Sequence, residues 1–584
     1  MAEARIVRRT GLTLSPLTRI RNSFGAESIV LIVALLLAIY LALTPIVMLL
    51  YTSFRTTSLV LSQETYTLSN YVEAYTDPEF LPLLGNSLFY AAGVCIVTFV
   101  IGTSLAWVCE RTNTPLRRIF YVLALATYVI PGVLNAIAWL LLLSPRIGVI
   151  NSWIADVLKL SQVPFNLYSL PGMVWVASIH MYPIMFLMMS VSMKSMDATL
   201  EEAAWVSGSS IFSSIRKITL RSLRPAMISG LLLLFIRGIE SFEVPALVGV
   251  PGNIEVFTTK IYLALQNAVP PKMGLASALA VTLFIIGALG VYLYRRMTAH
   301  AERYATVTGR GFHPRQIDLG SWKYVLCGAW LLFFAVTLFL PLTILFWVSL
   351  LPQVAPLSLE MLNKLSLDQY AFALTYPTIV RAFSNSFILA VTSSAAVMLL
   401  TAVIAWISVR SKVRGKWLLD VLTFLPITIP SVIMGVSLLF VFLTLPIPVY
   451  GTLIPLFIAY ITMFLPYGIR IMSATIIQIH KELEEAAVVS GSSWPRMFGR
   501  IVLPLILPGM LAGWLYLVVL TLRELSASIF LVTQGTEVLS TVTFSLWAEG
   551  HLTSVAALGI LITAFLVFLA AFVQGLYRKL GIVI

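Results

Sequence analysis

Long apolar runs recur along the whole of this 584-residue chain, and they constrain its fold more than any other feature. A helix that crosses the hydrocarbon core of a bilayer needs about 20 consecutive apolar residues. Twelve runs of this kind are predicted, with approximate bounds 29–51, 85–109, 119–143, 171–192, 226–248, 273–294, 325–349, 384–409, 417–444, 452–474, 509–532 and 553–576. Strands of a membrane barrel would be about ten residues long with alternating polarity, which does not fit these runs. The sequence therefore predicts an all-α polytopic membrane protein with about twelve transmembrane helices.

The composition agrees with a chain that is solvated mainly by lipid. Hydrophobic residues make up 59% of the sequence and charged residues only 11%, whereas soluble domains carry about 25% charged residues. The first apolar run is longer than the core of a signal peptide, and no small-residue cleavage site follows it closely. We therefore expect this run to remain as the first membrane helix.

The basic residues lie mostly on one side of the predicted spans. Of the 38 Lys and Arg, seven fall in loops on the other side and two fall inside spans. Loops rich in Lys and Arg stay in the cytoplasm. This distribution predicts that both termini are cytoplasmic, and it explains the net charge of +13 without a nucleic-acid partner.

The two halves of the chain repeat one plan. "NSLFYAAGVC" at Asn86 matches "NSFILAVTSS" at Asn385, and "IPGV" at Ile130 matches "IPSV" at Ile429, both at an offset of 299 residues. From Pro183 onward the offset is 283, because the first half has a longer loop between its third and fourth spans. Each half has six spans and begins in the cytoplasm, so the repeats are parallel. The predicted segments are a cytoplasmic N-terminal segment (1–28), a first half (29–294, cytoplasmic loop 193–225), a linker (295–324) and a second half (325–584, cytoplasmic loop 475–508).

One polar phrase occurs once in each cytoplasmic loop, "EEAAWVSGSS" from Glu201 and "EEAAVVSGSS" from Glu484. In the first copy Thr199 and Glu202 form a capping box, which predicts a helix start. The glycine within each phrase, Gly208 or Gly491, suits a helix C-cap. One such helix would most simply pack on its own membrane domain, but two copies at equivalent positions indicate a pseudo-symmetric partner below the membrane.

At these residues the chain resembles the permease subunits of type I binding-protein-dependent ABC importers. The family pattern is E-A-A, three residues, Gly, nine residues and I-x-L-P. The second copy matches it completely, whereas the first has Arg221 in place of the proline. By this resemblance, the ATPase-coupling residues are Glu201, Glu202, Ala203, Ala204, Gly208, Glu484, Glu485, Ala486, Ala487 and Gly491.

The resemblance implies that each phrase forms a coupling helix that inserts into a homodimer of ATP-binding cassette subunits. It also implies a periplasmic substrate-binding protein and a location in the bacterial cytoplasmic membrane. The chain contains no P-loop, since its Gly415-Lys416 pair is followed by Trp417. We therefore expect no catalytic site, metal or cofactor in this chain, with ATP and magnesium bound by the partner ATPase.

Charged residues also occur inside the fifth span of each half. They are Arg237, Glu240, Glu243, Arg523 and Glu524. Charges at this depth usually face a bundle interior or a water-filled cavity. Two hypotheses remain open, namely that these side chains line the translocation pathway or that each arginine is neutralised by a neighbouring glutamate.

The stretch from Ser241 to Tyr262 and the fused twelve-span plan resemble the ferric-iron branch of these permeases. Ferric iron is therefore the expected substrate, with a polyamine, thiamine, a phosphonate or another small solute as alternatives. A secondary transporter of the major facilitator type also has two parallel six-helix halves. The Glu-Ala-Ala loops favour the ABC importer over that alternative.

Overall fold

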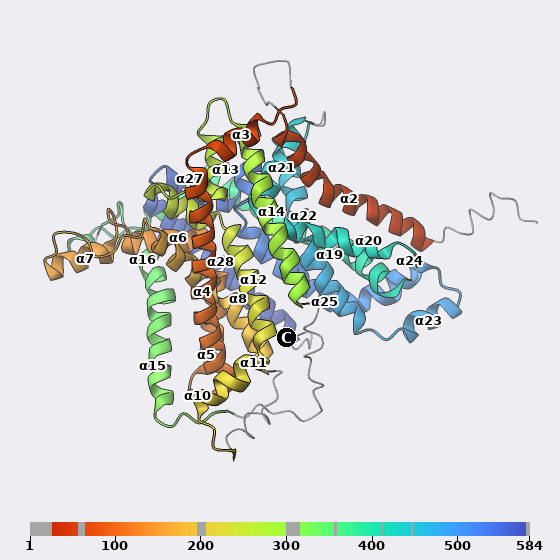
Figure 1. The fold of residues 1–584 in the computed structure, drawn as a ribbon, viewed down its shortest axis with the longest axis horizontal. Coiled ribbons are helices and arrows are strands. Elements are labelled where there is room, and N and C mark those ends of the chain that lie inside the picture. Colours follow the sequence, from red (N-terminus) through yellow and green to blue (C-terminus); the bar gives the residue numbers. More distant parts are fainter. Residues whose placement is uncertain are drawn as a thin grey trace, which may run out of the picture.

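The computed structural model describes residues 26–55, 65–194, 206–298, 316–355, 359–411, 413–444 and 448–579. Throughout these ranges the regular structure is helical, with two isolated β-bridges and no strand. Nine of the described helices are long and apolar enough to cross a membrane, and twelve spans result if three sharply bent helix pairs each count as one. Figure 1 shows these helices gathered around a common centre. The predicted all-α membrane architecture is confirmed.

The helices of the two halves occur in the same order. The first half contains α2 (Ala26–Ser53), α3 (Ser69–Thr76), α4 (Phe80–Arg111), α5 (Arg117–Val129), α6 (Gly132–Leu143), α7 (Val149–Leu158), α8 (Leu170–Lys194), α10 (Ile211–Ser214), η1 (Ile215–Thr219), α11 (Leu220–Ser222), α12 (Arg224–Ile239), η2 (Pro245–Gly249), η3 (Val250–Gly252), α13 (Phe257–Gln266) and α14 (Met273–Thr298). The second half contains α15 (Trp322–Phe334), η5 (Ala335–Phe339), α16 (Leu340–Ser349), α17 (Leu359–Leu362), α18 (Asp368–Thr375), α19 (Pro377–Arg410), α20 (Lys416–Phe424), η6 (Leu425–Thr428), α21 (Ser431–Thr444), α22 (Ile454–Ile477), α23 (Glu482–Val489), α24 (Trp494–Met497), η7 (Phe498–Val502), α25 (Leu503–Leu522), α26 (Ser528–Leu531), α27 (Leu539–Ala548) and α28 (Leu552–Lys579).

The third span of each half is broken, which corrects the continuous helices predicted at 119–143 and 417–444. α5 and α6 meet at 96°, and the α20–η6 segment meets α21 at 105°. Both bends fall at the repeated Ile-Pro pair, where Ile130 and Ile429 have extended backbones. A proline disfavours the helical conformation in the residue before it. The apolar pattern continues through the break, so hydropathy alone could not locate it.

The fifth span of each half ends earlier than the predicted bounds 226–248 and 509–532. α12 ends at Ile239 and α25 ends at Leu522, each just before or within the charged stretch. Hydroxyl groups from α13 and α27 bind backbone carbonyls just beyond these helix ends. Thr258 donates to Ser241 O (2.8 Å), and Ser540 donates to Glu524 O (2.5 Å). Irregular backbone at membrane depth is tolerated where protein buries it or where it lines a cavity.

The two halves are interlocked. α2 of the first half packs against α20 and α21 of the second half as well as against α14 of its own half. α16 of the second half packs against both α28 and α6. The broken third spans therefore lie where the halves meet.

Candidate functional site

The loop that carries the second Glu-Ala-Ala phrase (475–508) is anchored to its own membrane domain through one residue of α23. Glu484 is 8% exposed, and its carboxylate accepts a hydrogen bond from Trp406 Nε1 (2.9 Å) and lies 3.2 Å from Arg410 Nε. Arg410, in the last turn of α19, also donates to Ile476 O (2.9 Å) and to Ile479 O at the end of α22. Glu484 thus joins α23 to the C-terminal ends of two membrane helices, α19 and α22.

The opposite face of α23 is open. Glu485 and Ala486 are exposed, and Val488 and Val489 are 60% and 88% exposed. Ala487, by contrast, is buried at 8%. The short helix therefore presents two carboxylates, those of Glu482 and Glu485, and several small or apolar side chains away from the membrane domain. No side chain caps its N-terminus, as expected from the loss of the threonine found in the first copy.

Each copy of the repeated phrase contains a glycine turn. Gly208 has φ +81° and Gly491 has φ +78°, the left-handed conformation that glycine adopts at little cost. The left-handed conformation expected of these glycines is present in both halves, and in the second half it follows the end of α23. In the first copy Glu201, Glu202, Ala203 and Ala204, together with the predicted Thr199 cap, lie outside the described residues. Figure 1 shows α10 and α11 of the first loop well apart from α23 of the second.

At the end of α12, Arg237 is neutralised by a neighbouring carboxylate. Its Nη1 lies 2.6 Å from Glu240 Oε1, three residues further on. Its Nη2 donates to the hydroxyl of Tyr467, which lies on α22 of the other half. The pairing hypothesis therefore holds for Arg237, and the pair also bridges the halves.

At the end of α25, Arg523 has different partners. Its Nη2 lies 3.0 Å from His180 Nε2, on α8 of the other half, and its guanidinium carbon lies 4.7 Å above the Tyr128 ring. Tyr128 and His180 are themselves stacked, with ring centroids 6.0 Å apart. Each arginine thus contacts the fourth span of the opposite half.

Glu524 does not pair with the adjacent Arg523. Its carboxylate accepts hydrogen bonds from the backbone of Ala527 (2.7 Å) and Ser528 (3.1 Å) and from the Ser528 hydroxyl. It caps the short helix α26, which begins a few residues after the end of α25 at Leu522. Glu243 lies against α6, where an added Cβ on Gly132 would stand 1.8 Å from Glu243 Oε2.

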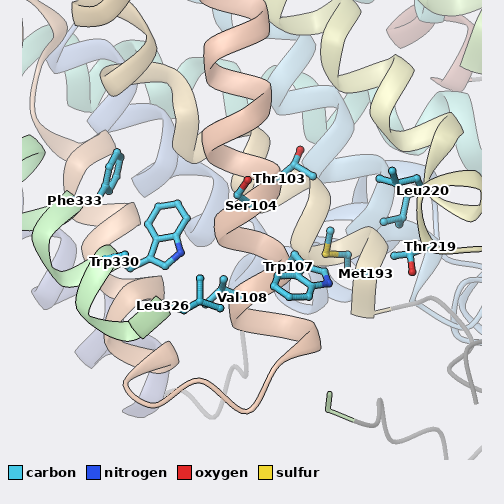
Figure 2. Close-up of a pocket in the computed structure, with 12 residues that line it drawn as sticks. Thr103, Ser104, Trp107, Val108, Met193, Thr219, Leu220, Leu326, Trp330 and Phe333 are labelled. Atoms are coloured by element: carbon cyan, nitrogen blue, oxygen red, sulfur yellow. The ribbon is translucent and has the colours of Figure 1, made fainter. Parts of the chain in front are cut away.

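A cavity of about 570 Å³ lies elsewhere, between α4, α8, α11 and α15. Figure 2 shows Trp107, Leu326 and Trp330 around it. Its lining is largely apolar, carries no charged side chain and includes none of the predicted site residues. The cavity is therefore distinct from the charged region at the ends of α12 and α25.

Sequence reasoning missed the anchoring of Glu484 and the contacts between halves. A signal for the first was present, because Trp406 and Arg410 of α19 have counterparts in Trp107 and Arg111 of α4, at the offset of 299. The positions that correspond to His180, Tyr128 and Tyr467 in the other half hold residues of other types. The repeat therefore gave no sign that these three side chains contact the arginines.

Comparison with known proteins gives a family match in both halves. The model of the "Binding-protein-dependent transport system inner membrane component" matches residues 98–302 and 397–581. A putative ferric transport system permease protein, FbpB 1 of Haemophilus influenzae, is 25% identical over 488 residues, covering 81% of this chain and 74% of that protein. The ferric transport system permease protein FbpB of Actinobacillus pleuropneumoniae is 25% identical over 81% of this chain and 68% of its own length.

Half-length relatives match as well. The sulfate transport system permease protein CysT of Salmonella typhimurium is 26% identical over 267 residues, which cover 44% of this chain and 92% of that protein. A solved bacterial ABC transporter that imports the acidic polysaccharide alginate matches with a TM-score of 0.34 and 20% identity, over 44% of this chain and 94% of that chain. The family match rules out the major facilitator alternative. With both halves matched over most of their length, the chain belongs to the inner-membrane components of binding-protein-dependent transport systems, as a fused, two-domain permease of an ABC importer.

Proposed function

We propose that this permease is driven by separate ATPase subunits that dock on its two coupling loops. The open face of α23, with Glu485 and Ala486 exposed ahead of the Gly491 turn, is the observation that carries the proposal. A short helix with small side chains fits a groove on a partner, and a repeated phrase fits a symmetric pair of partners. ATP and magnesium bind in those subunits, and both termini of this chain face the same cytoplasmic side.

We further propose that the cargo is ferric iron, delivered to the outer face by a periplasmic binding protein. Two relatives that align with 81% of the chain are described as ferric transport permeases, which supports iron over a polyamine, thiamine or phosphonate. The charged residues at the ends of α12 and α25 line the pathway, where Glu240 and Glu243 stand near the junction of the halves.

The test combines transport and ATP hydrolysis in the reconstituted complex. Glu485→Gln should lower binding-protein-stimulated ATPase activity and iron uptake together, while the chain remains inserted. The control is Glu549→Gln, in an exposed turn between α27 and α28, which should leave both activities unchanged. Normal stimulated ATPase activity in the Glu485 variant would exclude the coupling role, and failure of the unaltered complex to take up iron would exclude the cargo.

A further inference from the structure

Arg523 is partly buried, and the described residues place no charged group within hydrogen-bond distance of it. Its Nη2 contacts His180, its Nε is buried without a hydrogen-bond partner, and no carboxylate of the described residues lies within 4.0 Å. Arg237 differs, since Glu240 neutralises it at 2.6 Å. An arginine inside the membrane is costly and normally faces a bundle interior or a water-filled cavity, paired with other groups. Arg523 therefore has no carboxylate partner among the described residues.

The two nearest carboxylates do not fill this role. Glu524 is occupied in capping α26 through three hydrogen bonds. Glu243 makes no hydrogen bond or ion pair with any described residue and interacts with Arg523 only over a longer distance. Its carboxylate rests beside Gly132, where an added Cβ would also stand 3.4 Å from His180 Nε2. Glu243, His180 and Arg523 thus border one small region between the halves.

The hydrogen-bonding of His180 shows which groups remain available in that region. A guanidinium always donates, so His180 Nε2 must accept from Arg523, which leaves the imidazole proton on Nδ1. His180 is therefore a neutral acceptor that orients the guanidinium and adds no positive charge. Nη2 carries a second hydrogen besides the one that His180 accepts. Of the two Nη2 hydrogens, one shares an edge of the guanidinium with Nε–H and the other shares an edge with Nη1–H, so one complete edge is left, and such an edge binds an oxyanion through two parallel hydrogen bonds.

We propose that Arg523 binds an oxyanion (a carboxylate, phosphate or sulfate group) at the junction of the two halves, with His180 and Tyr128 as positioning residues. This deepens the proposed function and rests on it, because the site lies in the proposed pathway. The oxyanion has two possible sources, either a ligand that accompanies a ferric ion or a cargo that is itself an oxyanion. Glu243 stands beside this site as a like charge and opposes anion binding.

Substitutions of Arg523 and of Glu243 should have opposite effects on anion binding. Thermal unfolding of the intact transporter in detergent should shift upward with citrate, phosphate or sulfate. Arg523→Gln should abolish the shift, and Arg523→Lys, which keeps the charge but not the two-bond geometry, should weaken apparent affinity at least tenfold. Glu243→Gln should strengthen it. The matched control is Arg381→Gln, because this exposed arginine is already paired with a carboxylate, that of Glu537, and its shift should equal that of the unaltered protein.

The double variant Glu243→Gln/Arg523→Gln distinguishes an oxyanion site from a second explanation, in which Arg523 and Glu243 form a long-range ion pair that serves only stability. An ion pair predicts that the double variant regains stability and transport, whereas an oxyanion site predicts that it stays without anion response and without transport. Uptake of radioactive iron supplied with labelled citrate, beside uptake of labelled phosphate and sulfate, identifies the source. Iron uptake unaffected by Arg523→Lys, or no anion shift in the unaltered transporter, would overturn the oxyanion site while leaving the importer assignment intact. Oxyanion uptake without iron uptake would instead overturn the iron cargo and retain the site.

Discussion

Glu484→Gln should loosen the second coupling helix without unfolding the membrane domain. The carboxylate is buried between Trp406 Nε1 and Arg410 Nε, and the side chains of Glu484 and Arg410 are only 10% and 7% exposed. Removing one partner of a buried ion pair costs about 3–5 kcal/mol, because the other charge stays buried. Arg410 keeps its hydrogen bonds to the carbonyls of Ile476 and Ile479, so we expect a cost at the lower end, about 3 kcal/mol.

A cost of about 3 kcal/mol changes the docking equilibrium of α23 roughly 100-fold, since about 1.4 kcal/mol corresponds to a factor of ten. Amide hydrogen exchange in the intact complex measures this local opening. Protection across residues 482–490 should fall by that factor, while the amides of α22 remain protected. Glu485→Gln is the internal control, because Glu485 is exposed and its loss leaves the anchor in place. It should impair ATPase coupling and leave protection unchanged.

A double-mutant cycle with Arg410→Gln isolates the pairwise contribution. We expect a coupling energy of about 2 kcal/mol between Glu484 and Arg410, larger than the about 0–1 kcal/mol of exposed pairs. A coupling energy near zero, or unchanged protection of α23 in Glu484→Gln, would show that Glu484 does not anchor α23. Glu484 would then be expected to contact the ATPase instead.

Three further outcomes are expected. Gly491→Ala should destabilise the end of α23 by about 1–2 kcal/mol through its positive φ alone, since nothing lies within 4 Å of an added Cβ; Gly491→Asn should cost less, and hydrogen exchange distinguishes the two. Gly132→Ala should displace the Glu243 carboxylate and lower transport, at a cost of about 1–3 kcal/mol in thermal stability. The backbone N–H of Gly320 and the side chain of Asn113 hold the pKa of Asp318 below its usual range. The contact between Asp318 of the linker and Asn113 should therefore be stable above about pH 4 and be lost as the pH falls through the lowered pKa. Proteolysis of the linker should show this acid dependence, and an Asp318→Asn variant should abolish it.

The sequence was sufficient for the number of spans, the parallel repeat and the glycine turns. These depend on hydropathy, on exact residue matches such as Pro131 with Pro430, and on the conformational freedom of Gly208 and Gly491. The bends at 96° and 105° were not predicted, because an apolar run keeps its hydropathy through a proline. A proline at the same place in both halves was the available signal.

The surroundings of the charged residues depended on tertiary structure. From the spacing alone, Arg237 and Glu240 could be expected to pair, since they are three residues apart, and they do. The same spacing argument fails for Arg523 and Glu524, because adjacent residues on a helix point in different directions and the helix has already ended. The separation of these two residues follows from the capping of α26, which no periodicity reveals.

The two halves repeat the helical framework but not the charged residues at the ends of α12 and α25. At the offset of 283, Glu240 of the first half corresponds to Arg523 of the second, so equivalent positions carry opposite charges. Yet both arginines contact the fourth span of the opposite half, through Tyr467 and His180. Any rocking of one half against the other must stretch both contacts at once or carry α8 with α25 and α22 with α12. An oxyanion bound at Arg523 would lie beside only one of these contacts, that with His180, so its binding should act on the two sides of the junction unequally.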